Sequence, residues 1–102
     1  MYTVEITESA ESDLGQITDY LGFKLANPQA AASFLDEVAR VSEVLAETPE
    51  LFPLCFDTRL AELGYRRATV RAYILVYEVD IDAELVRVLR FFHESENYAN
   101  KL

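Results

Sequence analysis

Residues 2–6 alternate between apolar and polar side chains, which predicts a short, half-buried strand. Between residues 10 and 21 an apolar side chain then recurs every three or four positions. This period predicts an amphipathic helix that runs to about Lys24. Thr7 precedes the helix and is suited to cap it, because a threonine hydroxyl accepts a hydrogen bond from the first turn.

A second helix is predicted to begin at Asn27-Pro28, since asparagine is a good N-cap and proline is favoured at the first helical position. Its apolar stripe continues to Leu45, and Pro49 ends it. Only residues 25–27 separate the two helices, and so short a connection predicts an antiparallel helical hairpin.

Three more strands are expected at about residues 65–70, 72–79 and 85–93, which are rich in Val, Ile, Tyr and Phe. The preceding residues 49–64 are predicted to form a loop with one turn of helix. The order β-α-α-β-β-β predicts an α+β domain of two layers, in which the helical hairpin covers one face of an antiparallel sheet. We expect the other face to be partly open and to carry the function.

The 102 residues, 51% of them hydrophobic, suit a single domain spanning 1–102. No apolar run approaches the roughly 20 residues of a membrane span, and the first residues lack the pattern of a signal peptide. We therefore expect a cytoplasmic protein without a membrane partner. The single cysteine, Cys55, lies in an apolar stretch and is interpreted as a small buried hydrophobe. No metal site or cofactor is predicted.

The net charge of −9 argues against a general nucleic-acid binder. The charges are unevenly distributed, however. Residues 1–57 carry 11 acids against two basic residues, whereas residues 58–102 carry seven of each. The second half therefore can form a local basic site on an acidic protein.

Several stretches, in this order and spacing, resemble toxins of the RelE/ParE superfamily, also known as plasmid-stabilisation proteins. They are Ser9–Leu14, Asn27-Pro28, Gly64-Tyr65-Arg66, Tyr73–Tyr77 and Val86–Arg90 leading to His93. The resemblance implies a RelE-like fold and the growth-inhibiting toxin of a type II toxin–antitoxin system, neutralised by a cognate antitoxin. It leaves two targets open: mRNA on the ribosome, cut by an endoribonuclease (an mRNA interferase), or a protein such as DNA gyrase. A degenerate, non-toxic interaction domain is the alternative, and the oligomeric state is open.

Metal-free RNA cleavage needs a base, a cation for the phosphorane and an acid. If the protein is a nuclease, the resemblance implies a catalytic set of Arg66, His93 and Tyr98. Arg66 would grip phosphate, His93 would titrate near neutral pH, and Tyr98 would hold a proton or stack on a base. Each also has a structural interpretation: a strand arginine paired with an acid, a structural histidine, and an aromatic that fixes the C-terminal residues to the core.

Substrate-binding candidates are Arg67, Arg90 and Tyr73. Arg66 and Arg67 are neighbours on a strand, so their side chains point to opposite faces and one should reach the open face. The C-terminal residues depart from the family, because Glu94–Tyr98 carries two carboxylates where relatives often carry arginines. Since carboxylates repel RNA phosphates, a protein target ranks level with RNA cleavage.

Overall fold

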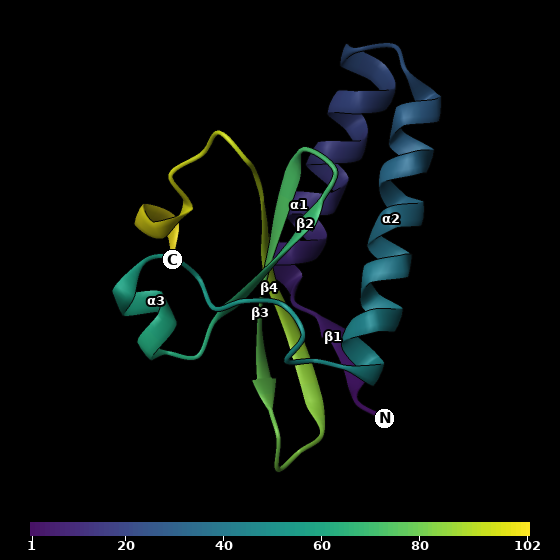
Figure 1. Cartoon of the computed structure of the whole chain (residues 1–102). Coiled ribbons are helices and arrows are strands. Elements are labelled where there is room, and N and C mark those ends of the chain that lie inside the picture. The colour runs from purple at the N-terminus through teal and green to yellow at the C-terminus, as the bar shows by residue number, and fades with distance from the viewer.

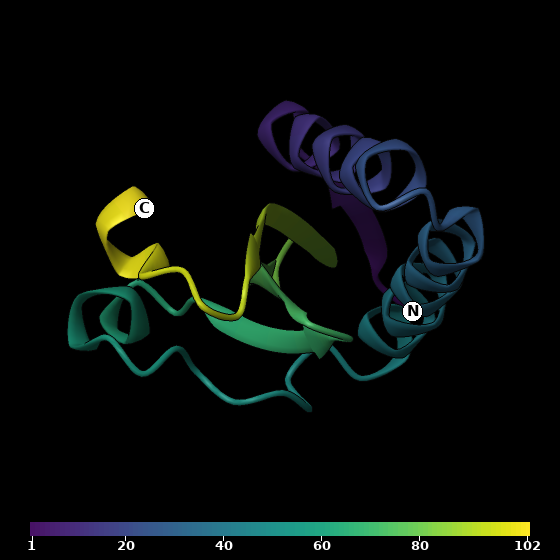
Figure 2. The same ribbon diagram turned by 90° about the horizontal axis from the view of Figure 1, so that it is seen from above.

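A hairpin of two helices lies along one side of a four-stranded sheet in the computed structural model, which describes all 102 residues (Figure 1). A short third helix and the C-terminal residues lie on the other side (Figure 2). The elements in chain order are β1 (Thr3–Ile6), α1 (Glu8–Asp19), η1 (Tyr20–Lys24, a π-helix), α2 (Pro28–Glu47), α3 (Thr58–Glu62), β2 (Arg66–Val70), β3 (Tyr73–Asp80), β4 (Leu85–His93) and η2 (Tyr98–Lys101, a 3₁₀ turn).

Both long helices begin where the sequence predicts. The Thr7 hydroxyl accepts a hydrogen bond from the Ala10 N–H at 3.2 Å, and the Asn27 side chain accepts one from the Ala30 N–H at 3.1 Å. The first helix does not stay α-helical to its end, because its last turn widens into η1. The hairpin and the three-strand meander are confirmed, and α3 is the single helical turn expected in the loop.

The sheet is mixed, which corrects the expectation of a purely antiparallel one. Its strand order is β1-β4-β3-β2, and β1 pairs parallel to β4 from Thr3 opposite Leu85 to Ile6 opposite Val88. The physical reason is the hairpin, which returns the chain to the end where β1 began. There the Tyr2 N–H donates to the Ala46 carbonyl at 2.8 Å. Strand β2 then runs in the same direction as β1, and after two reversals of the chain β4 does so again.

Two hydrophobic cores lie on opposite faces of the sheet. The larger packs the hairpin stripe (Phe34, Val38, Val41, Leu45) against inward side chains of β2, β3 and β4. The smaller packs Cys55 and Leu60 against Val76 and Phe92. The second face is therefore covered by residues 55–65 and the C-terminal residues, and the expectation that it would be partly open is wrong. The apolar residues of both segments shield the outward side chains of the meander from water.

Cys55 is buried, as expected of a small hydrophobe, with 4% of its surface exposed. None of the helices has the length and apolarity needed to cross a membrane.

Candidate functional site

A groove of about 740 Å³ lies beside the second half of β4. Strand β1 pairs only with residues 85–88, so residues 89–93 form an edge of the sheet that faces α1. The groove is bounded by α1 and η1, by the end of β4 and by the C-terminal residues, with side chains that include Ile17, Tyr20, Arg90, Phe92, His93 and Lys101. The groove combines aromatic, apolar and cationic side chains and offers a concave surface to a partner.

Asp13 anchors the floor of this groove. Its carboxylate accepts hydrogen bonds from Arg90 Nε at 2.7 Å and Nη2 at 3.1 Å, and from the Phe91 backbone N–H at 2.9 Å. The hydrogen bonds that Arg90 donates to Asp13, supported by the negative charge of the carboxylate, raise the pKa of Arg90. Asp13 thus connects α1 to β4 and satisfies an N–H that the sheet leaves unpaired. Arg90, a predicted substrate-binding residue, is held in this pair.

His93 and Tyr73 lie at the end of the groove where β3 meets β4. Their rings make an edge-on contact with centroids 5.3 Å apart. His93 Nδ1 is 2.7 Å from the Ser95 hydroxyl, and the His93 N–H donates to Glu96 at 2.9 Å. Tyr73, a predicted substrate-binding residue, is only 9% exposed and packs against Phe34, so its ring belongs mainly to the larger core.

Arg66 is held by the loop that follows α2. Its Nη1 donates to the Phe52 carbonyl at 2.7 Å, and its Nη2 lies 3.5 Å from Glu50. Its strand neighbours Ala68 and Val70 lie in the larger core, so Arg66 is on the hairpin side of the sheet. Of the two neighbouring arginines it is therefore Arg67 that points to the other face, and the donors of Arg66 fix this loop instead of remaining free for phosphate.

Tyr98 and Arg67 lie on the other face. The Tyr98 ring stacks on Phe92 with centroids 5.6 Å apart, and partial burial raises the pKa of its hydroxyl. Burial likewise raises the pKa of the neighbouring Cys55 thiol. The Arg67 guanidinium lies 3.8 Å from the centroid of the Phe56 ring. Tyr98 therefore has the structural role considered above, an aromatic side chain that fixes the C-terminal residues.

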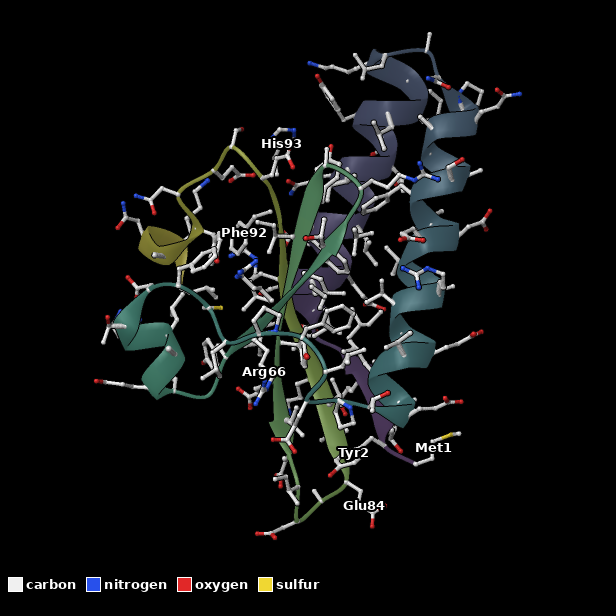
Figure 3. All side chains as sticks on the ribbon, viewed as in Figure 1. Met1, Tyr2, Arg66, Glu84, Phe92 and His93 are labelled. Atoms are coloured by element: carbon white, nitrogen blue, oxygen red, sulfur yellow. The ribbon has the colours of Figure 1, made fainter.

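The three predicted catalytic residues do not come together, and Figure 3 shows Arg66 and His93 well apart. Arg66 pairs with Tyr77 and His93 with Tyr73, so they are separated by four positions of β3 in addition to two strand widths. Four positions alone correspond to about 13 Å. Tyr98 is on the opposite face from Arg66. No cluster of potential metal ligands is present either.

Two residues that make notable contacts were not predicted. Asp13 belongs to the predicted first helix, and nothing in its local sequence marks a partner at Arg90. Phe56 lies outside the groove, on the other face of the sheet, and 82% of its surface is exposed. No local signal marks this exposure, because an apolar residue directly before a helix cap often packs against the helix.

The arrangement of hairpin, mixed sheet and small second core is shared with solved structures from toxin–antitoxin systems. A solved structure described as the chromosomal ParDE toxin–antitoxin system from P. aeruginosa matches with a TM-score of 0.70 and 18% identity, covering 91% of this chain and 96% of that one. The RelBE2 toxin–antitoxin complex from Mycobacterium tuberculosis matches with a TM-score of 0.63 and 23% identity over 90% and 96% of the two chains. YafQ from E. coli strain BL21(DE3) matches with a TM-score of 0.58 and 17% identity, covering 93% of this chain and 96% of that one. At these identities the matches show a shared fold.

The sequence itself provides the assignment. Residues 4–98 match the family described as "ParE toxin of type II toxin-antitoxin system, parDE". The chain belongs to the ParE toxin family, which confirms the resemblance found in the sequence. No curated protein sequence matches it significantly.

Proposed function

We propose that this ParE-family toxin arrests growth by binding a protein, such as DNA gyrase, and not by cutting mRNA. The observation that carries the proposal is the dispersal of Arg66, His93 and Tyr98. The donors of Arg66 are used by a loop, His93 bonds to Ser95, and Tyr98 is part of the second core. A general base, a phosphate-binding cation and an acid must reach one phosphate together, and these three side chains lie too far apart for that.

Charge supports the same proposal. The net charge is −9, and the two most prominent cations of the groove, Arg90 and Lys101, are paired with Asp13 and Glu96. RNA binding draws its affinity from unpaired cations that replace counterions on phosphates. Binding to a protein surface does not require such unpaired cations.

We also propose a cytoplasmic location and a cognate antitoxin as the partner that neutralises the toxin, as in the toxin–antitoxin systems that share its fold. The groove beside β4 is the site we assign to the antitoxin, because it is large and bordered by exposed apolar side chains. Tyr20 is 47% exposed and Leu25 is 53% exposed. Leu25→Glu should therefore weaken neutralisation by the antitoxin while growth arrest persists.

The test is inducible expression, followed by mapping of mRNA ends with and without translation and by a gyrase supercoiling assay with purified toxin. We expect growth arrest without new mRNA ends. His93→Ala and Tyr98→Phe should still arrest growth provided that they fold. Arg66→Ala is less informative, since it also releases residues 50–52. New cleavage ends that depend on His93 would refute the proposal, and expression without growth arrest would favour the degenerate domain.

A further inference from the structure

Phe56 and Arg67 form an exposed surface on the far side of the sheet from the hairpin, which we call the Phe56 surface. Phe56 is 82% exposed, although a phenylalanine ring gains from leaving water. The Arg67 guanidinium lies 3.8 Å from the ring centroid, at cation–π distance. The pair thus presents an aromatic side chain and a cation together.

The Phe56 surface is held rigidly. The Cys55 N–H donates to the Tyr65 carbonyl at 2.9 Å, and the Arg67 N–H donates to the Pro53 carbonyl at 3.0 Å. Residues 53–55 thereby extend the sheet beyond β2, and the buried Cys55 fixes them from below. On the other side of Phe56, Asp57 caps α3 by accepting from the Leu60 N–H at 3.1 Å. A ring fixed between two such anchors loses little conformational entropy on binding.

Arg67 also lacks an acidic partner. Five of the nine basic side chains form ion pairs with acids of the chain, namely Arg40, Arg66, Arg87, Arg90 and Lys101. Arg67 forms none, and its Nε is shielded from water with no hydrogen-bond acceptor. In a chain with twice as many acids as bases, an arginine that pairs with none of them can bind a carboxylate from outside.

We propose that the Phe56 surface docks the toxin's protein target, which offers an apolar pocket to the Phe56 ring and a carboxylate to the Arg67 guanidinium. This inference rests on the proposed function and names the surface that performs it. Aromatic residues and arginine are the side chains most enriched at the energetic centres of protein interfaces. Nucleic acid fits less well, because Asp57 adjoins the ring and one unpaired guanidinium provides no track for successive phosphates.

The experiment compares Phe56→Ala and Arg67→Gln with Phe23→Ala as a matched control. Phe23 is a phenylalanine of nearly equal exposure, 83%, on η1 at the far end of the hairpin. Each variant is expressed from an inducible promoter at measured protein levels, with and without antitoxin, and its thermal unfolding is recorded. We expect Phe56→Ala and Arg67→Gln to need about 30-fold more toxin for half-maximal growth arrest, the change expected for loss of an interface hot spot. Phe23→Ala should behave as wild type, and the antitoxin should bind all three variants.

Four results would overturn the inference. Unchanged growth arrest by both Phe56→Ala and Arg67→Gln would remove the surface from target binding, and an equal loss in Phe23→Ala would show that any exposed ring has the effect. Intact toxicity with lost neutralisation would assign the surface to the antitoxin. Binding of an RNA oligonucleotide that Phe56→Ala abolishes would assign it to nucleic acid. New mRNA ends in the wild type would instead refute the proposed function itself, so the two failures are distinguishable.

Discussion

Replacing Asp13 with alanine tests whether one carboxylate holds the first helix to the edge of the sheet. Asp13 is 9% exposed and receives three hydrogen bonds, two from Arg90 and one from the Phe91 N–H. Alanine removes all three and leaves the backbone N–H without an acceptor, in a position that water reaches poorly.

The expected loss of stability follows from these contacts. A buried N–H left without an acceptor costs about 1–3 kcal/mol. The ion pair contributes less than a fully buried one, because the Arg90 side chain is 31% exposed and can turn toward water. We therefore expect Asp13→Ala to lower the free energy of unfolding by about 2–4 kcal/mol. For a domain of this size that is a fall in melting temperature of about 8–16 °C.

Urea and thermal unfolding followed by circular dichroism measure this change. Asp13→Asn should lower the free energy of unfolding by about half as much as Asp13→Ala, since the amide oxygen can still accept a hydrogen bond from the Phe91 N–H. Glu37→Ala is the control: it removes an ion pair with Arg40 on the exposed face of α2 and should leave stability nearly unchanged. If Asp13→Ala were as stable as wild type, Asp13 would not act as a structural anchor, and its carboxylate would be free for a role in the groove.

Three further predictions concern other parts of the fold. Tyr77→Phe should cost about 1–2 kcal/mol, because the buried hydroxyl donates to the Pro49 carbonyl at 2.7 Å. Burial also raises the pKa of Tyr77 from 10.0 to about 12. The contribution of the Tyr77 hydroxyl to the free energy of unfolding should therefore be complete below pH 10 and be lost as pH rises toward 12. A titration of phenolate absorbance would show this ionisation. The hydrogen-bonded ion pair with Lys101 and the hydrogen bond from the His93 N–H lower the pKa of Glu96 from its ordinary 4.5. The C-terminal turn should therefore loosen as pH falls below that value, which would be measured as faster amide exchange. Glu96→Gln should abolish this pH dependence. Phe34→Ala should cost about 3–5 kcal/mol in urea unfolding, because the ring is fully buried against Tyr73 and Phe91.

The sequence predicted the elements well because their signals are local. The caps at Thr7 and Asn27, the apolar periods of both helices and the β-branched meander all act within a few residues. The parallel pairing of β1 with β4 was missed, since four residues of alternating polarity do not show which strand they join or in which direction. The second core was missed for a similar reason: Cys55 and Phe92 are far apart in sequence and each looks like an ordinary apolar residue.

The site was predicted less well because its contacts cross the whole chain. Strand alternation correctly placed Arg66 and Arg67 on opposite faces of the sheet. Contacts distant in sequence determine which guanidinium remains without an acceptor in the chain. Arg66 donates to a backbone carbonyl in the loop after α2, whereas the Arg67 guanidinium lies over the Phe56 ring. Asp13 and Arg90 are 77 positions apart, and no pattern within a single element announces such a pair.

Strand β4 lies in the middle of the sheet yet is the last strand to leave the ribosome. Until residues 85–93 have been synthesised, β1 has no neighbour to pair with and the helical hairpin covers an incomplete sheet. The sheet therefore cannot be completed until the last of its strands has been synthesised, although that strand is one of its two central ones.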